Sequence, residues 1–459
     1  MSYDVAIIGG GVVGCAVARE LAAFDLRIVL IEARGDIGDA TSKANTAILH
    51  TGFDAMPGSL ESTMVARGYQ LLSGYASVTG IPVEHTGALL VAWDADQLAV
   101  LPKLREKAEK NGYAKCEIVG ADEVYRRVPD LGPGALGGLT VPDESIICPW
   151  TTPLAYATEA KARGVDFLLS CFVESVEVGA DSTVLRTSSG EITTRWLINT
   201  AGLGGDVIDR MLGFDRFTIV PRRGELFVFD KLTRSMANTI VLPVPTEKGK
   251  GVLISPTIFG NVMLGPTSEN LVDRTDTSTS EEGFNFLLEK GAALMPSLID
   301  EEVTASYAGL RASTEHSDYV VDIDAKRRYL LLGGIRSTGL TASMALGEHA
   351  RQLLGTAGLD LVPKAQLPSP PQMPNIGEAF PRPYQRADLI ASDPAYGQIV
   401  CFCERVTRGE IRDALASPLP PCDLDGLRRR TRALMGRCQG FFCGAEIDEM
   451  LRVGGDDHG

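Results

Sequence analysis

The chain has 459 residues, of which 44% are hydrophobic, so it is long enough for a large core divided over two or three domains. Its formal net charge of −15 argues against nonspecific electrostatic binding to nucleic acid or to an anionic membrane surface. The basic run 428–430 is too short to change this conclusion. No apolar run reaches the roughly 18 residues of a membrane-spanning helix, and the first residues enter a strand without a basic or apolar leader. We therefore expect a globular protein of the cytoplasm.

The amino-terminal segments DVAIIGG, GVVGCAVARELAAF and LRIVLIEA predict a strand, a glycine turn with a helix, and a second strand. Gly9, Gly11 and Gly14 form the pattern G-x-G-x-x-G, whose glycines let the backbone approach a pyrophosphate. Glu32 ends the second strand, where its carboxylate can accept a hydrogen bond from a ribose hydroxyl. These features predict a dinucleotide site. Because NTAGLGGDVI from Asn199 lacks the same spacing, we expect a single dinucleotide, and FAD rather than NAD.

From about Thr86, short β-rich runs bounded by Gly and Pro predict a mostly antiparallel sheet: GALLVAW, GALGGLTVP, GELFVFD and GNVMLGPTS. WTTPLAYATEAKARGV has helical periodicity, whereas VDFLLSCFVESVEV and RWLINTAG are typical of strands. We predict an α/β fold, α+β overall, in which a Rossmann-like FAD-binding domain is interleaved with a mostly antiparallel β substrate domain. The predicted ranges are 1–75, 150–215 and 303–360 for the FAD-binding domain, 76–149 and 216–302 for the substrate domain, 361–384 for a proline-rich linker, and 385–459 for a small helical module.

Nine cysteines in a long chain without an export signal suggest thiols or metal ligands rather than a disulfide framework. Four of them are clustered: Cys401 and Cys403 are followed, after 34 intervening residues, by Cys438 and then Cys443. Two close pairs of thiolates suit either zinc or an iron-sulfur cluster. The C-x-C and C-x4-C spacings are atypical of zinc knuckles, which favour C-x2-C, and the spacing by itself leaves both kinds of site open.

Three separated segments, DVAIIGGGVVGCAVARELA, LINTAG and LLLGGIRSTGLTAS, resemble the flavin-contacting segments of the D-amino-acid-oxidase (DAO) superfamily. The resemblance implies further FAD contacts at Thr41, Ser42, Asn45, Thr46, Val173, Ala201 and Gly202. It also implies contacts with the isoalloxazine ring at Gly334, Ser337, Thr338, Gly339 and Leu340. CFCERVTRGEIRDAL with LRRRTRALMGRCQGFFC resembles the bacterioferritin-associated-ferredoxin-like module. This second resemblance implies a 2Fe-2S cluster on the four clustered cysteines.

Flavin-dependent oxidation of a CH–OH group needs a base for the hydroxyl proton and cationic donors for an acidic group on the substrate. TSKANTAILHTGFDAMPGSLES is similar to a flavin loop of L-2-hydroxyglutarate oxidases, and YAGLRAST and MLGPTS resemble segments of the anaerobic glycerol-3-phosphate dehydrogenase large subunit. These resemblances favour His50 as the base, with His316 as the second choice. They favour Arg311 and Arg336 as donors to an anionic substrate, with Arg223 as a weaker candidate. A structural hydrogen bond or ion pair is the alternative role for each of them.

The sequence therefore predicts a dehydrogenase that passes electrons from FAD through a 2Fe-2S cluster to a one-electron acceptor protein or partner subunit. GGIRSTGLTAS lacks the Lys and Thr-x-Arg of the glycerol-phosphate type and is closer to the hydroxyglutarate type. A 2-hydroxy acid such as 2-hydroxyglutarate and a polyol phosphate such as glycerol 3-phosphate both stay open as substrates. The alternatives are an amine or amino-acid dehydrogenase subunit of the imino-acid or opine type, and an electron-transfer subunit that serves a catalytic partner. The cluster could also be purely structural.

Overall fold

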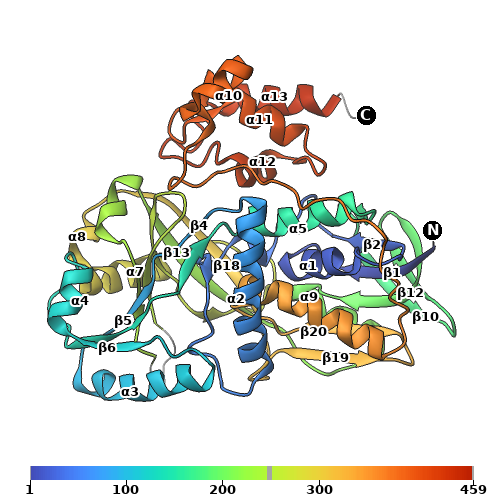
Figure 1. The fold of residues 1–459 in the computed structure, drawn as a ribbon, viewed down its shortest axis with the longest axis horizontal. Helices are drawn as coiled ribbons and strands as arrows, with labels where there is room; N and C mark the ends of the chain where they lie inside the picture. Colours follow the sequence, from blue (N-terminus) through green and yellow to red (C-terminus); the bar gives the residue numbers. More distant parts are fainter. Residues whose placement is uncertain (1, 246–250, 457–459) are drawn as a thin grey trace.

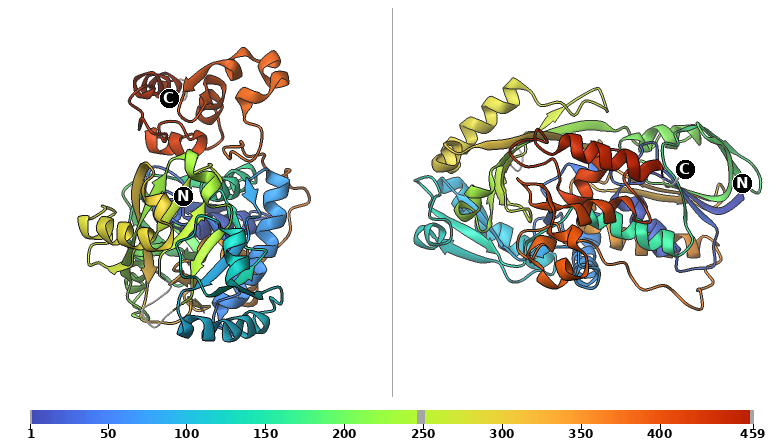
Figure 2. Two further views of the ribbon diagram at one scale, coloured as in Figure 1. Left: turned by 90° about the vertical axis from the view of Figure 1, so that its left-hand side faces the viewer. Right: turned by 90° about the horizontal axis from the view of Figure 1, so that it is seen from above.

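The chain folds into a broad body of two side-by-side parts, with a small carboxyl-terminal module standing on one side of the body (Figure 1). The computed structural model describes residues 2–245 and 251–456. Two perpendicular views place the module on the same side of the body (Figure 2). None of the helices in these two ranges combines the length and the hydrophobicity that crossing a bilayer requires.

The first part of the body is built on a sheet that, within the described residues, has eight strands. They are β1 (Ser2–Ile8), β2 (Ile28–Ile31), β9 (Asp166–Leu168), β10 (Val173–Val178), β11 (Thr183–Thr187), β12 (Gly190–Asn199), β19 (Val320–Asp324) and β20 (Tyr329–Gly333). Strand β1 is central and pairs in parallel with β2 and β12, and β20 pairs in parallel with the end of β12. Both faces of β1 are buried, because Val5 and Ile7 enter one hydrophobic cluster while Ala6 and Ile8 enter another. This is the pattern of a parallel strand covered on two sides.

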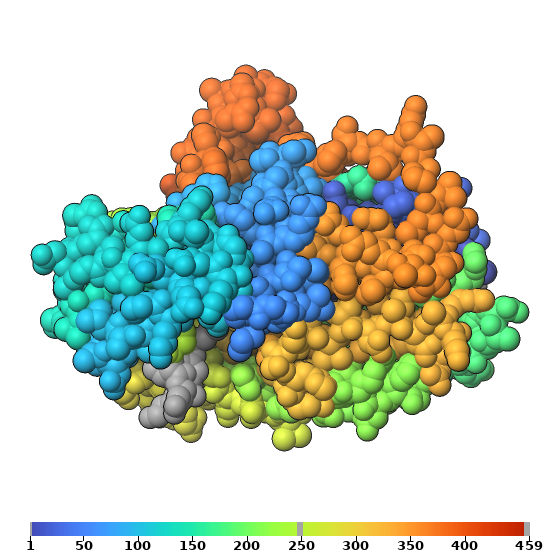
Figure 3. Space-filling model, turned by 60° about the horizontal axis from the view of Figure 1, so that its bottom comes forward, coloured from blue at the N-terminus to red at the C-terminus, as the bar shows by residue number. Residues whose placement is uncertain are grey.

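Four helices cover one face of this sheet: α1 (Val12–Leu21), α2 (Leu60–Thr79), α5 (Thr151–Ala162) and α9 (Gly339–Thr356). Helix α1 packs against α5 and α9, and α9 also packs against α2. The longest of them, α2, begins at Ser59, whose side chain caps the first turn, and ends at Gly80 in a left-handed conformation. Seen from below, α2 (blue) lies between α3 (cyan, Ala95–Lys110) and the orange segments around α9 (Figure 3). Helix α6 (Gly205–Met211) contacts β10, β12 and β20 of the same sheet.

The second part of the body is a mostly antiparallel sheet of nine strands in the described residues. They are β5 (Ala88–Ala92), β6 (Glu117–Gly120), β7 (Gly137–Val141), β13 (Val220–Phe229), β14 (Ile240–Pro243), β15 (Leu253–Pro256), β16 (Val262–Gly265), β17 (Glu269–Asn270) and β18 (Val303–Ser313). The helices α3, α4 (Ala121–Arg127), α7 (Glu281–Leu294) and α8 (Pro296–Ile299) pack around it. A small sheet of β3 (Ile48–Leu49), β4 (Val83–Glu84) and β8 (Ser145–Ile147) accompanies the two large ones.

The predicted fold class is confirmed, since a parallel βαβ unit is interleaved with a mostly antiparallel sheet. The predicted domain boundaries stay a prediction; the long strand β18 lies within the range 303–360 and pairs with β13 of the second sheet. VDFLLSCFVESVEV is divided into β9 and β10 by a turn at Ser170, whose φ of +52° ends the extended run.

A segment without helix or strand runs from Ala357 to Arg382 and lies along the body. Four backbone hydrogen bonds tie it there: the N–H groups of Lys364, Met373 and Glu378 donate to carbonyl groups of the body, and the carbonyl oxygen of Val362 accepts from the N–H of Asp25. The module that follows contains the short turns η4 (Pro383–Gln385) and η5 (Pro394–Gly397), the strands β21 (Ile399–Cys401) and β22 (Val406–Thr407), and the helices α10 (Ala387–Ser392), α11 (Arg408–Leu415), α12 (Leu424–Thr431) and α13 (Gly444–Asp456). It has a small apolar core of its own.

Candidate active site and cysteine cluster

A cavity of about 530 Å³ lies at the carboxyl ends of β1, β2 and β20, where ligands bind in open α/β sheets. Most of the predicted cofactor residues are on its wall: Gly9, Gly11, Glu32, Thr41, Ser42, Asn45, Thr46, Val173, Ala201, Gly202, Gly334, Ser337, Gly339 and Leu340. Gly14 and Thr338 are not on the wall. The cavity thus brings together residues from four separate stretches of the chain.

The glycine turn between β1 and α1 needs glycine at two positions. Gly9 has a φ of +106°, and a Cβ at Gly14 would lie 1.9 Å from the carbonyl oxygen of Gly9. The turn is held by two side chains: Glu32 Oε2 accepts from the N–H of Gly10 at 2.6 Å, and Ser42 Oγ accepts from the N–H of Val12 at 3.0 Å. Burial raises the pKa of Glu32. A cavity that includes a glycine turn and a helix amino terminus on its wall suits a dinucleotide.

His50 lies on the wall of the cavity and contacts a buried carboxylate. Its Nδ1 is 3.1 Å from Oε2 of Glu144, a residue with 0% exposure just before β8. The other oxygen of Glu144 accepts from the N–H and the hydroxyl of Thr51 at 2.7 and 2.8 Å. The N–H of His50 donates to Thr341 Oγ1 at the start of α9. Glu144 therefore orients the imidazole, and Thr341 holds the backbone from which it projects.

Arg311 differs from the other arginines that are predicted to bind an anionic substrate, because it has no polar partner in the part of the chain that the structure describes. It lies on β18 opposite Arg222 of β13, and among the described residues it has no hydrogen bond and no ion pair. Burial, and to a lesser extent the charge of Arg222, lower the pKa of Arg311. Because Tyr307 and Arg311 are four residues apart on a strand, they share a face, and the Tyr307 hydroxyl donates to the carbonyl oxygen of Asn45 at 2.9 Å. Arg311 thus lies on the face of β18 that meets the cavity loop, although not on the cavity wall.

The other predicted catalytic residues form hydrogen bonds or ion pairs with other residues of the protein. Arg336 lies on the cavity wall, donates to the carbonyl oxygen of Ser317 at 2.6 Å and is 3.5 Å from Glu61. His316 is exposed, away from the cavity wall, and contacts the carbonyl oxygen of Arg216 at 3.0 Å. Arg223 is buried among carboxylates, with ion pairs to Glu225, Glu269 and Asp276. The structure therefore brings His50 and Arg336 to the cavity, and places His316 and Arg223 elsewhere.

Glu144 and Tyr307 were not singled out from the sequence. Glu144 stands alone in VPDESIICPW, and only the pairing of β3 with β8 brings it to His50. Burial raises the pKa of Tyr307, and its hydroxyl holds the loop that contains Asn45 by a hydrogen bond. Neither has a local pattern that distinguishes it from an ordinary Glu or Tyr.

The four clustered cysteines meet in the carboxyl-terminal module. Their thiols contact in two pairs, Cys403 with Cys438 and Cys401 with Cys443. Backbone N–H groups of residues 440–442, chiefly Phe442, donate to Cys438 and lower its pKa, whereas burial raises the pKa of Cys403, and that of Cys443 to about 12. No set of three or more His, Cys, Asp or Glu side chains in the described ranges converges on a single ion. Four thiols in two pairs, with N–H groups directed at a sulfur, fit a cluster with two irons better than one zinc ion.

Two family models match separate ranges of the chain. Residues 4–353 match the family model "FAD dependent oxidoreductase" (DAO). The chain belongs to the DAO family of FAD-dependent oxidoreductases. Residues 399–452 match the "BFD-like [2Fe-2S] binding domain", which covers all four clustered cysteines.

Curated relatives of this DAO-family chain include a "Glycerol 3-phosphate dehydrogenase" from Caloramator mitchellensis, 34% identical over 98% of the chain and 94% of the relative. An "L-2-hydroxyglutarate dehydrogenase" from Salmonella houtenae is 30% identical over 62% of the chain and 69% of the relative. Among solved structures, "L-alpha-Glycerophosphate Oxidase from Mycoplasma pneumoniae with FAD bound" is 27% identical with a TM-score of 0.77, and the match covers 82% of the chain and 100% of that structure.

These findings confirm the two cofactors and the enzyme class. The DAO-family chain is a flavoprotein oxidoreductase that uses FAD and carries a 2Fe-2S domain. The cavity at the glycine turn lies within the range that matches the FAD family, and the four cysteines lie within the range that matches the 2Fe-2S domain. The individual contact residues stay predictions.

Proposed function

We propose that the enzyme oxidises the CH–OH group of a small anionic donor, with glycerol 3-phosphate as the first candidate and a 2-hydroxy acid as the second. The observation that carries this proposal is the guanidinium of Arg311, which has no hydrogen bond or ion pair within the described residues and lies on the face of β18 that meets the cavity loop. A buried cation without a protein partner is costly and favours an anionic ligand. FAD, when bound, supplies a two-electron acceptor for the hydride of the donor carbon.

His50 is suited to take the hydroxyl proton. When Nδ1–H donates to Glu144, the basic lone pair of the imidazole is on Nε2, which accepts the proton from the substrate oxygen. The carboxylate of Glu144 then stabilises the imidazolium that forms. Thr51 holds Glu144 in place through the second oxygen, so the ring keeps its orientation during the transfer.

Arg311 and Arg336 are suited to bind the acidic end of the donor. A guanidinium group binds a phosphate or a carboxylate through two parallel hydrogen bonds, and Arg336 is already oriented by Ser317 and Glu61. The chemistry of these donors fits both anions. Glycerol 3-phosphate is placed first because the relative that spans both domains of the chain bears that name.

We further propose that electrons leave through the carboxyl-terminal domain to a one-electron acceptor protein or partner subunit. Three aromatic rings next to the cysteines are exposed, Phe402 by 62%, Phe441 by 96% and Phe442 by 70%. Exposed rings around a redox site favour contact with another protein. The acidic net charge of the chain favours a basic face on that partner.

Anaerobic titration of the holoenzyme tests the proposal. Glycerol 3-phosphate, L-2-hydroxyglutarate, glycine and L-proline are added in turn while flavin absorbance and the reduced-cluster paramagnetic resonance signal are recorded. We expect bleaching of the flavin with a hydroxy donor, followed by the cluster signal. Bleaching only with an amino acid would replace the proposal by an amine dehydrogenase, and reduction by dithionite alone would favour an electron-transfer subunit.

A further inference from the structure

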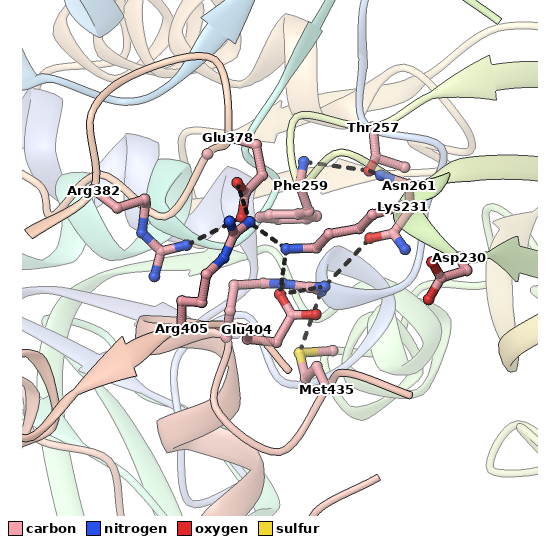
Figure 4. Close-up of polar contacts among 12 residues, drawn as sticks. Asp230, Lys231, Thr257, Phe259, Asn261, Glu378, Arg382, Glu404, Arg405 and Met435 are labelled. Carbon is pink, nitrogen blue, oxygen red and sulfur yellow. Dashed lines mark hydrogen bonds and ion pairs between the residues drawn. The ribbon is translucent and has the colours of Figure 1, made fainter. Parts of the chain in front are cut away.

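A group of buried charges joins the module to the body beside the cysteines. Glu404, directly after Cys403, is 3% exposed and accepts from Lys231 of the body at 3.0 Å and from Arg432 of the module at 3.2 Å. Lys231 also donates to Glu378 at 2.7 Å. Figure 4 shows Lys231 reaching from the body to the carboxylates of Glu378 and Glu404. The cysteine loop is thus held to the body by ion pairs that centre on the buried carboxylate of Glu404.

Arg432 extends from the module into the body. Only 5% of this residue is exposed, and its guanidinium carbon lies 4.4 Å from the ring centre of Phe259 and 5.8 Å from that of Trp150. These two rings stack with centres 4.7 Å apart. Nη2 of Arg432 is 3.4 Å from Oδ1 of Asn261, whose own Nδ2 donates to the backbone of β13. The guanidinium therefore occupies a socket made by the body, defined here as Phe259, Trp150 and Asn261.

The backbone at Arg432 is in a conformation that arginine rarely adopts. It caps the end of α12 with a φ of +73°, where glycine is the usual residue. Arg405, on the other cysteine loop, has a φ of +53°, but its side chain is 45% exposed and pairs with Glu378. A strained arginine that is also buried against another domain indicates that its side chain is needed there.

The socket continues to the flavin cavity. Nε1 of Trp150 donates to the carbonyl oxygen of Lys43 at 3.0 Å. Lys43 ends the turn η1 (Thr41–Lys43), and Thr41 and Ser42 lie on the cavity wall. A short series of contacts, from Glu404 through Arg432 and Trp150 to Lys43, therefore connects the cysteine loop with the cavity wall.

We propose that Arg432 is a positioning residue that fixes the cysteine loops relative to the flavin cavity by filling this socket. The module is then docked rather than merely tethered by residues 357–382. A fixed separation matters because electron transfer between two redox centres slows steeply as the distance between them grows. The proposal concerns residues outside the substrate site, and hydrogen exchange and scattering test it without any donor.

Two variants and a matched control test the proposal on the holoenzyme. Arg432→Gly removes the guanidinium and relieves the positive φ, so the module should keep its fold and its cluster absorbance. Phe259→Leu removes a socket ring from the body without touching the module. Arg405→Gly removes the same charge and relieves the same kind of backbone strain, but its side chain is largely exposed.

Docking is read from amide hydrogen exchange in the body peptide 257–261 and from the maximum dimension in small-angle X-ray scattering. We expect exchange in this peptide to rise about ten- to hundred-fold in Arg432→Gly and Phe259→Leu, because a desolvated cation and its aromatic partners are separated. Arg405→Gly should stay within about three-fold of the wild type. The delay between flavin bleaching and the cluster signal should lengthen only in the first two variants.

Each outcome bears on the proposal. If Arg432→Gly and Phe259→Leu keep the exchange, the scattering and the delay of the wild type, the proposal is overturned. If Arg432→Gly loses the cluster, Phe259→Leu decides, because that change lies in the body and cannot unfold the module from within. An effect of Arg405→Gly equal to that of Arg432→Gly would show that charge or strain, rather than the socket, controls docking, and would also overturn it.

Discussion

Arg311 and Arg432 are both arginines that lie largely within the protein, in two regions that use the same group differently. Arg432, between module and body, is surrounded by Glu404, Asn261 and aromatic rings. Arg311, beside the flavin cavity, has no polar partner in the described residues, and burial lowers its pKa. A guanidinium satisfied by protein holds two parts of the protein together, whereas one left unsatisfied is available to a ligand.

The same contrast extends to the neighbouring groups. Around the module, Asp36 of the body is 2% exposed and accepts from Arg429 at 2.8 Å and from Arg430 at 2.7 Å. Around the cavity, the buried carboxylate of Glu144 is directed at an imidazole that can gain a proton. At the docking surface, each buried carboxylate is already paired with a guanidinium group. At the cavity, Glu144 gains a cationic partner only when His50 takes up the proton of the substrate.

The largest effect on the rate of flavin reduction is expected from a change at His50. His50→Ala should slow flavin bleaching by the true donor about 10²- to 10⁴-fold, the usual contribution of a general base. Stopped-flow absorbance under anaerobic conditions measures this rate, and the FAD content gives the control. If bleaching by the true donor proceeds at the wild-type rate in His50→Ala, the base lies elsewhere and the electron-transfer alternative gains.

A smaller loss is expected when the unpaired cation is removed. Arg311→Ala should lower kcat/KM for the anionic donor about 10²-fold or more, because a desolvated charge pair with the substrate is lost. Arg222→Ala, the exposed neighbour across the strands, is the matched control and should stay within about three-fold. Equal losses in the two variants would contradict a specific role for Arg311.

On the docking side, Asp36→Asn should weaken the contact between module and body by about 3 kcal/mol, because two buried guanidinium groups lose their anionic partner. Hydrogen exchange of the peptide that contains α12 measures the change. Asp425→Asn, an exposed carboxylate in the first turn of the same helix, is the control and should have little effect. An unchanged exchange rate in Asp36→Asn would show that the socket of Arg432 suffices alone.

The pH dependence of docking follows from Asp36. Burial by itself would raise its pKa, but hydrogen bonds and charges from Arg430 and Arg429 outweigh burial and lower it. The contribution of Asp36 is therefore complete above about pH 4 and is lost as the pH falls through the lower folded-state pKa. We expect constant exchange in α12 between pH 7 and pH 5, corrected for intrinsic rates, and faster exchange below pH 4. Asp36→Asn should abolish this dependence.

The sequence predicted the parts of the site whose residues are close together in the chain. Gly9, Gly11, Gly14 and Glu32 belong to one βαβ unit, and each cysteine pair lies within six residues. Spacing therefore indicated a dinucleotide site and a thiolate site, and the family resemblances then favoured FAD and a 2Fe-2S cluster. The partners that join distant segments could not be predicted in this way. Glu144 reaches His50 only through the pairing of β3 with β8.

The basic run 428–430 is another case in which the sequence did not reveal the tertiary contacts of its residues. As a sequence it is a short basic stretch, and only the docking of α12 shows that Arg429 and Arg430 are buried on Asp36, almost 400 residues away in the chain. Arg432 is likewise unremarkable in LRRRTRAL until its positive φ and its aromatic contacts are known. Local patterns report local geometry, and both of these contacts depend on the tertiary fold.

The smallest effect is expected where the docking surface meets water. Arg437, directly before Cys438, pairs with Asp230 of the body at 3.0 Å, but 49% of its side chain is exposed. Solvent screens such a pair, so Arg437→Ala should change hydrogen exchange in 257–261 by no more than about two-fold. A loss of docking as large as that of Arg432→Gly would mean that long-range charge holds the module, and docking would then weaken with added salt. Salt-independent docking together with a silent Arg437→Ala would instead locate the holding interaction in the buried contacts, which are the socket of Arg432 and the ion pairs of Asp36.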